Sequence, residues 1–294
     1  LVDFDISIID NLNPLTEIIQ ENPSIVGFTS DTMTFTRTIE LAKKLKRKLS
    51  VPFIVGGVHI TSMPESFDGV FDIAVMGEGE LVLLELLSNF LEDGSFLKAK
   101  LEKVRGIMFR DETRVVATGQ QEYIKEFDDL PYPARDLVPM EEVYLKDQLN
   151  LFGVKRLVSI MTSRGCPYNC IFCGSPVQWS SARFHTAEYV ASEIEFLVKK
   201  YRIDGIMFWD DLFITPKKRL KKLVACIKEK GLDKKLTFFG YARANLIDEE
   251  VCSLLQSINV KRLIFGLESG SDRVLQYLKG GSITVSDNQR AVRL

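Results

Sequence analysis

Short apolar runs alternate with longer segments of helical periodicity along most of this chain, and the alternation leaves few folds open. In the second half, four apolar runs are each followed by an amphipathic segment, and the run at 205–209 is apolar on consecutive residues. Such a run predicts a strand that is covered on both faces. Strands that alternate with helices predict a parallel sheet with right-handed crossovers. We therefore expect the opening part of a (β/α) barrel from about residue 157 onward.

The first half alternates in the same way. Apolar runs at 4–9, 25–28, 53–55 and 71–76 predict strands, and apolar residues at helical spacing predict a helix over 33–49. This pattern predicts a second α/β domain with a doubly wound parallel sheet. At 294 residues the chain is long enough for two domains.

The predicted domain limits follow from proline positions. Pro131 and Pro133 fix the backbone locally and restrict the residues before them, which predicts an extended linker. We expect one domain at 1–117, ending in a small hairpin, a linker at 118–154 and a second domain at 155–294.

Three of the five cysteines lie close together, as Cys166, Cys170 and Cys173, with the spacing C-x3-C-x2-C. Three thiolates can bind three irons of a four-iron cluster and leave the fourth iron open to a ligand that is not protein. A closed structural zinc site is the alternative, but it needs four protein ligands, usually in two separated pairs. His185 is a candidate for the fourth ligand. The spacing favours an iron–sulfur cluster over zinc or unrelated thiols.

At these residues the sequence resembles the radical S-adenosylmethionine (radical SAM) enzymes. Their signature, C-x3-C-x-aromatic-C, is matched by Cys166, Cys170, Phe172 and Cys173. The resemblance implies that the amino and carboxylate groups of SAM chelate the open iron and that one electron from the cluster cleaves the sulfonium. The product is a 5′-deoxyadenosyl radical or, in some members, methyl transfer through a second cofactor. Phe172 would then lie near the adenine; a hydrophobic cover over the cluster is the alternative for this position.

Polar residues follow the predicted strands of the second half: Asp210, Asp211, Tyr241, Arg243 and Glu268. In (β/α) barrels reactive groups gather at the carboxyl ends of the strands, so we expect these side chains near the cysteine loop. Carboxylates can accept hydrogen bonds from the ammonium and ribose of SAM, and an arginine can pair with its carboxylate. The alternative is a salt bridge of Arg243 with Glu268 or Asp211.

Two of these segments resemble the cobalamin-dependent subclass of radical SAM enzymes, F-x-D-D at 208–211 and G-x-E-S-G-S at 266–271. The resemblance implies that the aspartate pair holds the methionine ammonium, without choosing between its members, and that Glu268 lies near the ribose. The family's barrel has six strands, so we expect a truncated TIM barrel here. The chain begins with Leu1 and stops inside a predicted helix, which suggests a piece of a longer protein.

Three loops follow the predicted strands of the first half, where ligands of such sheets bind. Their candidate residues are Thr29 and Ser30, then Gly56, Gly57 and His59, then Gly77, Glu78 and Gly79. Glycines there let the backbone approach a bulky ligand closely. The G-G-x-H and G-E-G-E segments resemble the cobalamin-binding domain that precedes the radical SAM domain in this subclass. The resemblance implies that the loops surround the corrin ring and its nucleotide tail.

The lower axial ligand of cobalt is not assigned, because the D-x-H-x-x-G motif of other cobalamin proteins would precede Leu1. His59 belongs to another motif, and hydrogen bonding within its loop is the alternative to a cofactor contact. No cysteine precedes Cys166, which disfavours the methylthiotransferases, since they carry a second cluster on N-terminal cysteines. Trp179 and His185 are weaker candidates for contacts with cofactor or substrate.

Composition limits the partners. The chain has 38 basic and 40 acidic residues and no long basic run, so nothing indicates nucleic acid or an anionic membrane. No apolar run is long enough to span a membrane. One tight cysteine cluster fits a reducing cytoplasm, with Cys226 and Cys252 as packed or half-exposed thiols. A small-molecule substrate and an electron donor such as a flavodoxin or ferredoxin are the partners that the resemblance implies.

The sequence and its resemblance together predict a radical SAM enzyme with a [4Fe-4S] cluster, SAM and cobalamin. Its reaction would be radical methylation, or cyclisation or oxidation as in the anaerobic porphyrin cyclases, at an unactivated carbon. Two alternatives stay open: a radical SAM enzyme whose first domain does not bind cobalamin, and a non-catalytic zinc-binding or cobalamin-binding module. The substrate is not indicated.

Overall fold

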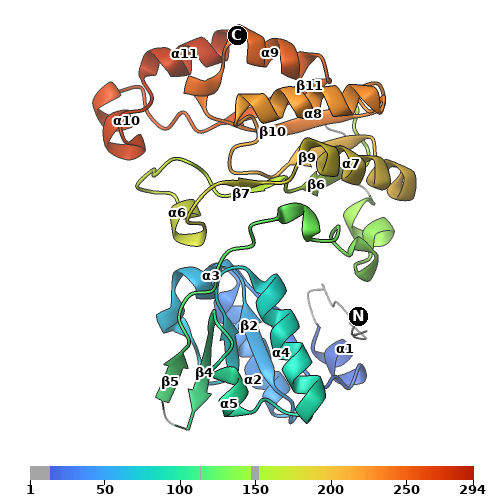
Figure 1. Ribbon diagram of the computed structural model, residues 1–294, viewed down its shortest axis with the longest axis vertical. Coiled ribbons are helices and arrows are strands. Elements are labelled where there is room, and N and C mark those ends of the chain that lie inside the picture. Colours follow the sequence, from blue (N-terminus) through green and yellow to red (C-terminus); the bar gives the residue numbers. More distant parts are fainter. Residues whose placement is uncertain (1–13, 113, 147–151) are drawn as a thin grey trace. The chain divides into compact units, whose positions relative to one another are not determined.

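The computed structural model describes residues 14–112, 114–146 and 152–294. The chain divides into two compact units, Leu1–Ile124 and Lys125–Leu294, each with its own sheet (Figure 1). The strand expected at 4–9 lies outside the described residues. None of the helices in the described ranges is long and apolar enough to cross a membrane.

The first unit is built on a five-stranded sheet in the order β1-β2-β3-β4-β5. Its strands are β1 (Val26–Thr29), β2 (Phe53–Gly56), β3 (Ile73–Val75), β4 (Ile107–Asp111) and β5 (Arg114–Ala117). The first three are parallel, and the last two form an antiparallel hairpin. The carboxyl ends of β1, β2 and β3 therefore lie along one edge, where the three candidate loops begin.

Helices cover both faces of this sheet (Figure 1). On one face α2 (Phe35–Lys46) packs Ala42 and Leu45 into a cluster that includes Phe53. On the other face α4 (Gly79–Asp93) contributes Val82 and Leu86. The remaining helices are α1 (Leu15–Gln20), α3 (Val58–Ser62), α5 (Lys98–Leu101) and the short η1 (Pro64–Ser66). The described part of this unit thus has the doubly wound layering that the sequence predicts.

The second unit holds a parallel four-stranded sheet in the order β11-β10-β9-β6. Its strands are β6 (Leu157–Ile160), β9 (Gly205–Phe208), β10 (Thr237–Ala242) and β11 (Val260–Phe265). The helices α7 (Ala187–Tyr201), α8 (Lys217–Glu229) and α9 (Glu249–Gln256) follow β6, β9 and β10. Four parallel strands joined by these crossovers confirm the partial (β/α) barrel.

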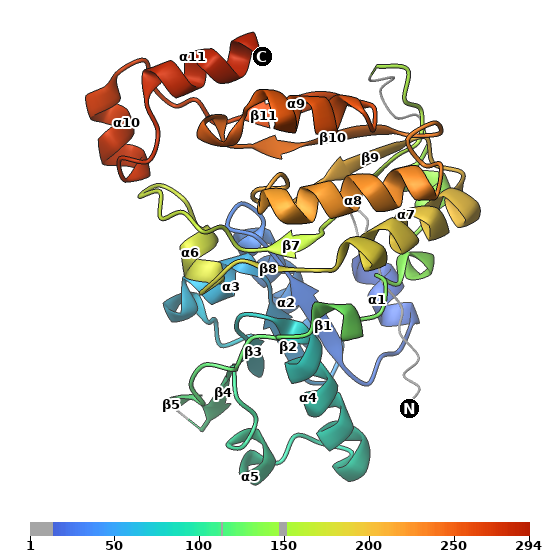
Figure 2. The same ribbon diagram turned by 45° about the horizontal axis from the view of Figure 1, so that its top comes forward.

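The large core of the second unit lies between its sheet and its helices. Phe208 and Phe238 of the sheet pack there with Leu223 of α8. Figure 2 shows α7 and α8 side by side over the sheet. The opposite face carries a smaller cluster of Val154, Met207 and Phe239.

Short elements complete the second unit. They are β7 (Ser163–Arg164), β8 (Arg183–Phe184), α6 (Ser175–Gln178), α10 (Asp272–Lys279), α11 (Val285–Arg293), η2 (Phe127–Asp129), η3 (Arg135–Leu137), η4 (Met140–Tyr144) and η5 (Ala244–Leu246). The two-stranded β7–β8 ribbon comes directly before and after the cysteine segment, so it frames that loop.

Candidate functional site

The clustered cysteines lie in the loop between β7 and α6, beyond the carboxyl end of β6. Cys166 and Cys170 are partly buried and Cys173 is exposed. Gly165 starts the loop at a φ of 85°, and a Cβ there would lie 2.6 Å from the carbonyl oxygen of Ser181. Only glycine allows this turn without strain. Further on, Ile171 N donates to Leu278 O at 3.0 Å, so the loop is anchored at both ends.

Hydrogen-bond donors reach the sulfurs of the cysteine loop. Arg243, which follows β10, donates from Nη1 to Cys170 Sγ at 3.2 Å. The backbone nitrogen of Ser175 donates to Cys173 Sγ at 3.4 Å. Burial raises the pKa of the Cys166 thiol, so a positive partner is needed to hold it as a thiolate. Such donors around cysteine sulfurs are typical of iron–sulfur clusters.

The donor set of the loop, three cysteines without a fourth protein ligand, favours a cluster over a closed zinc site. Among the described residues, no three His, Cys, Asp or Glu side chains form a group that could hold a single metal ion. A four-iron cluster makes no such demand, because each thiolate binds a different iron. His185, the fourth zinc ligand considered from the sequence, is engaged elsewhere, with Nδ1 3.0 Å from Asp128 Oδ1. The loop therefore fits an iron–sulfur cluster.

The two aspartates after β9 have different surroundings. Asp210 is 1% exposed, and its carboxylate accepts hydrogen bonds from Thr162 N at 2.5 Å, Thr162 Oγ1 at 2.5 Å and Ser163 N at 3.1 Å. Burial raises the pKa of Asp210, and these hydrogen bonds oppose the shift. Asp211 is exposed and accepts from Ser175 Oγ at 2.5 Å. Asp210 thus ties β9 to the end of β6, while Asp211 faces solvent beside the cysteine loop.

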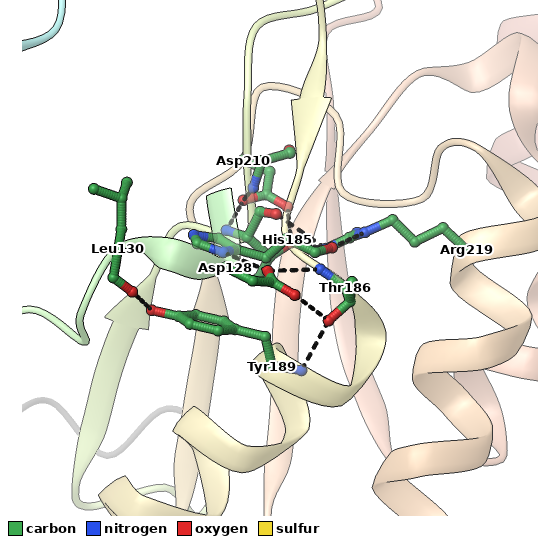
Figure 3. Close-up of polar contacts among 9 residues, drawn as sticks. Asp128, Leu130, His185, Thr186, Tyr189, Asp210 and Arg219 are labelled. Carbon is green, nitrogen blue, oxygen red and sulfur yellow. Dashed lines mark hydrogen bonds and ion pairs between the residues drawn. The ribbon is translucent and has the colours of Figure 1, made fainter. Parts of the chain in front are cut away.

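A polar network supports the start of the cysteine segment (Figure 3). Arg219 of α8 donates from Nη2 to Thr162 O at 3.0 Å and Thr162 Oγ1 at 2.9 Å, and from Nε to His185 O at 3.0 Å. Asp128 accepts from Thr186 N at 3.1 Å and Thr186 Oγ1 at 2.5 Å. The network joins η2, the end of β6, the start of α7 and α8.

His185 is part of this network. Its ring stacks on Tyr189 with 4.1 Å between centroids, and Tyr189 Oη donates to Leu130 O at 2.9 Å. Burial lowers the pKa of His185, although Asp128 opposes the shift. Burial also raises the pKa of Tyr189 to about 12. The contacts of His185 are thus those of a residue that holds α7 and η2 together.

Glu268 and Arg243 do not pair with each other, and each contacts other residues. Glu268 follows β11 with a φ of 61°, and its Oε1 lies 3.5 Å from Nζ of the buried Lys279. Lys279 also donates to Gly266 O. A positive φ at a non-glycine residue is a strained conformation that is enriched at functional sites. Within the described ranges Arg243 forms no ion pair with Glu268 or Asp211, the two pairings considered from the sequence.

Aromatic side chains are exposed on the same edge. Phe172 and Trp209 are each 54% exposed, and Trp209 makes a T-shaped contact with Tyr241 at 5.6 Å between centroids. Exposed apolar side chains that gather beside polar groups indicate a ligand surface. The guanidinium carbons of Arg164 and Arg183 lie 5.6 and 5.8 Å from the ring of Trp179.

In the first unit, the loops after β1 and β2 are packed closely. Gly57 has a φ of 98°, and a Cβ there would lie 2.7 Å from Ser30 O and 2.8 Å from Thr29 Oγ1. His59 is 6% exposed; its backbone nitrogen donates to Ser30 O at 3.3 Å, and its Nδ1 lies 3.1 Å from Thr32 Oγ1. The contacts of His59 therefore hold the two loops together.

A buried polar atom without a hydrogen-bond partner also lies at this edge of the sheet. Ser30 Oγ is buried and has no hydrogen-bond partner among the described residues. A buried polar atom without a partner is costly, so a ligand that offers a donor or acceptor would be favoured there. Gly77, at a φ of 77°, donates to Thr61 Oγ1 at 3.0 Å, and the buried Glu78 accepts from Ile124 N at 2.9 Å. The turns at Gly57 and Gly77 and the unpaired hydroxyl of Ser30 fit a bulky polar ligand such as cobalamin.

The fold and site define the class of the chain: two α/β units, the second with a three-cysteine loop at the carboxyl edge of a parallel sheet. Residues 2–87 match the family described as the B12 binding domain, and residues 160–294 match the radical SAM superfamily. The chain therefore carries a B12-binding domain followed by a radical SAM domain, as in the group of radical SAM enzymes that the sequence resembles, which confirms the resemblance. The cofactors of this group are a [4Fe-4S] cluster, SAM and cobalamin.

Relatives of the chain are named for methyl transfer and for ring formation. An uncharacterized methyltransferase of Pyrococcus horikoshii is 34% identical over 301 residues, which cover 98% of this chain and 62% of the relative. The anaerobic magnesium-protoporphyrin IX monomethyl ester cyclase of a Synechocystis strain is 27% identical over 281 residues, which cover 92% of this chain and 52% of the relative. The chain thus spans about half to three fifths of the length of these proteins.

Solved structures show the same fold. The radical SAM methyltransferase TsrM of Kitasatospora setae, with cobalamin and a [4Fe-4S] cluster bound, aligns with a TM-score of 0.71 at 21% identity, over 95% of this chain and 55% of TsrM. The cobalamin-dependent radical enzyme OxsB, with aqua-cobalamin bound, aligns with a TM-score of 0.76 at 21% identity, over 95% of this chain and 40% of OxsB.

Sequence reasoning missed three residues of this site. Ser175 links Asp211 to Cys173, Arg219 supports Thr162, and Asp128 joins η2 to α7. Ser175 follows the last cysteine closely, which was a usable signal. Arg219 and Asp128 carried none, because each contacts partners that are far away in the sequence.

Proposed function

We propose that this chain provides the cofactor-binding domains of a cobalamin-dependent radical SAM enzyme that methylates an unactivated carbon of a small molecule. The observation that carries the proposal is the three-cysteine loop, with Asp211 and Arg243 beside it, in a chain that also has a B12-binding domain. A second candidate is oxidative cyclisation, which the likeness to the magnesium-protoporphyrin cyclase favours.

Cys166, Cys170 and Cys173 would hold the cluster. When bound, the cofactors supply one-electron cleavage of SAM and carriage of a methyl group. The chain fixes the geometry of the three sulfurs through the turn at Gly165 and the hydrogen bond of Ile171 to Leu278. It also donates hydrogen bonds to two of the sulfurs, which orients them.

For SAM, we assign the ammonium contact to Asp211. Both oxygens of Asp210 already accept hydrogen bonds from Thr162, whereas Asp211 is exposed and oriented by Ser175. Asp210 is then a positioning residue. Phe172, Tyr241, Arg243 and Glu268 are the other SAM contacts that we propose.

For cobalamin, the proposed contacts are the three loops at the carboxyl edge of the first sheet. They comprise Thr29, Ser30, Gly56, Gly57, His59, Gly77, Glu78 and Gly79. The Ser30 hydroxyl is the best supported of these contacts, because it is buried and has no hydrogen-bond partner among the described residues. The ring of His59 packs on Phe35 at 4.0 Å between centroids, so we assign it support of the Ser30 loop rather than a bond to cobalt.

The remaining parts of the proposal concern the surroundings. A radical SAM reaction needs an electron donor, for which a flavodoxin or ferredoxin is suited, and a reducing compartment such as the cytoplasm. We keep domain limits of 1–117 and 155–294 with a linker at 118–154. The compact units divide at Ile124, inside that linker.

Product analysis tests the reaction class. The full-length protein, purified anaerobically and supplied with SAM, a reductant and a small-molecule methyl acceptor that donates the abstracted hydrogen, should form S-adenosylhomocysteine together with 5′-deoxyadenosine if it transfers methyl groups by a radical route. A cyclase would form 5′-deoxyadenosine without stoichiometric S-adenosylhomocysteine. Cluster-loaded protein that forms neither product would contradict the proposal.

A further inference from the structure

Arg243 is a buried cation that contacts a cluster cysteine. The residue is 8% exposed, and its Nη1 lies 3.2 Å from Cys170 Sγ. A guanidinium presents its donors in a fixed plane, so the direction of this hydrogen bond depends on how the rest of the group is held.

Neutral groups hold the guanidinium from three sides. Its Nε donates to Asn245 Oδ1 at 3.1 Å, and its Nη2 donates to Ser282 Oγ at 2.6 Å and to Lys279 O at 3.4 Å. Its central carbon lies 4.0 Å from the centroid of the Tyr168 ring. These contacts leave Nη1 aimed at the sulfur of Cys170.

None of these partners carries a negative charge. The described residues include no carboxylate within ion-pair distance of Arg243, whereas the half-buried Arg135 pairs with Glu193 at 2.8 Å. A buried charge is costly unless something compensates it. Of the groups that contact Arg243, Cys170 is the one that the proposed function places on the cluster, so the compensating charge would be that of the cluster and of the thiolate that binds it.

We propose that Arg243 raises the reduction potential of the iron–sulfur cluster through Cys170. The proposal rests on the proposed function, since it needs the cluster. One-electron reduction adds one negative charge to the cluster and its thiolates. A buried cation that donates to a ligand sulfur stabilises the reduced form more than the oxidised form.

This role differs from pairing with the carboxylate of SAM. A residue that only binds SAM changes the affinity for SAM and leaves the potential of the SAM-free cluster unchanged. A residue that acts on Cys170 changes the potential before SAM is added. A redox titration of the SAM-free protein therefore separates the two roles.

The test compares Arg243→Gln and Arg243→Lys with Arg262→Gln, a control that removes the same charge from an exposed arginine on β11. Each protein is reconstituted anaerobically, assayed for iron and sulfide, and titrated with the reduced cluster followed by electron paramagnetic resonance. At a fixed applied potential, we expect Arg243→Gln to lower the ratio of reduced to oxidised cluster about tenfold, the order of one charge-assisted hydrogen bond. Arg243→Lys should lie between, and Arg262→Gln should match the wild type.

Three results would contradict this inference. An Arg243→Gln cluster that titrates as the wild type does, with weaker SAM binding alone, would assign Arg243 to SAM only. Should that variant fail to hold a cluster, Ser282→Ala, which keeps the charge and removes one orienting bond, must shift the potential in the same direction by a smaller amount; no shift overturns the proposal. A wild-type protein without a cluster would remove the proposed function itself.

Discussion

At the scale of single residues, two adjacent aspartates have different structural roles. Asp210 and Asp211 are adjacent carboxylates at one strand end. Asp210 is buried and accepts three hydrogen bonds, whereas Asp211 is exposed and accepts a hydrogen bond from Ser175. The sequence predicted that an aspartate pair would follow this strand and left the choice between its members open. Burial is set by contacts with Thr162 and Ser163, which no local pattern reveals.

Substitution of the two aspartates should separate their roles. Asp211→Asn should weaken SAM binding to the cluster-loaded protein about tenfold, because the amide removes a charge-assisted contact. Asp210→Asn should lower the free energy of unfolding by about 2 kcal/mol, because the amide cannot accept every hydrogen bond that the carboxylate does. Equilibrium binding and urea unfolding measure the two effects. Unchanged SAM binding by Asp211→Asn would contradict our assignment.

His185 predicts a dependence of stability on pH. Burial lowers its pKa below the ordinary value of 6.5, so the unfolded chain binds this proton more tightly than the folded chain does. The neutral His185 side chain therefore makes its full contribution to the free energy of unfolding above about pH 6.5, and this contribution is lost as the pH falls below that value. His185→Gln, which keeps an amide hydrogen bond to Asp128, should lose less stability than the wild type between pH 7.5 and about 5.5. Equal losses in urea unfolding of both proteins would show that another group titrates.

At the scale of elements, periodicity predicted the strands and helices and their parallel order well. The apolar run at 205–209 became β9, buried on every residue of Gly205–Phe208, and the segment at 33–49 became α2. Loop conformations could not be predicted as well from the sequence, because they depend on the residues that pack against them. The turn at Gly57 is an example, since its constraint comes from the neighbouring strand end at Thr29 and Ser30.

Gly57 offers a matched pair of substitutions. Gly57→Ala places a methyl group 2.7 Å from Ser30 O at a φ of 98°, so the two loops must separate. Gly27→Ala, in β1, meets nothing within 4 Å. We expect Gly57→Ala to lose bound corrinoid while it retains iron, and Gly27→Ala to retain both. Corrinoid absorbance and iron analysis of the anaerobically purified proteins decide. Full corrinoid retention by Gly57→Ala would contradict the placement of cobalamin at these loops.

At the scale of the whole molecule, the order of the two domains and the class of chemistry could be predicted from short motifs. The cysteine spacing and the strand-end segments were specific enough to indicate the family. The supporting contacts could not be predicted in this way. The hydrogen bonds of Arg243 to Cys170 and of Arg219 to Thr162 join residues that only the folded chain brings together.

The central claim is that the cysteine loop holds a four-iron cluster in a protein that also binds a corrinoid. Its most direct test is the iron, sulfide, zinc and corrinoid content of anaerobically purified full-length protein. Cys170→Ala is the test variant, and Cys226→Ala, outside the loop, is the control. We predict about four irons and four sulfides with a corrinoid in the wild type and in Cys226→Ala, and loss of iron and sulfide in Cys170→Ala. Stoichiometric zinc without sulfide in the wild type would contradict the account.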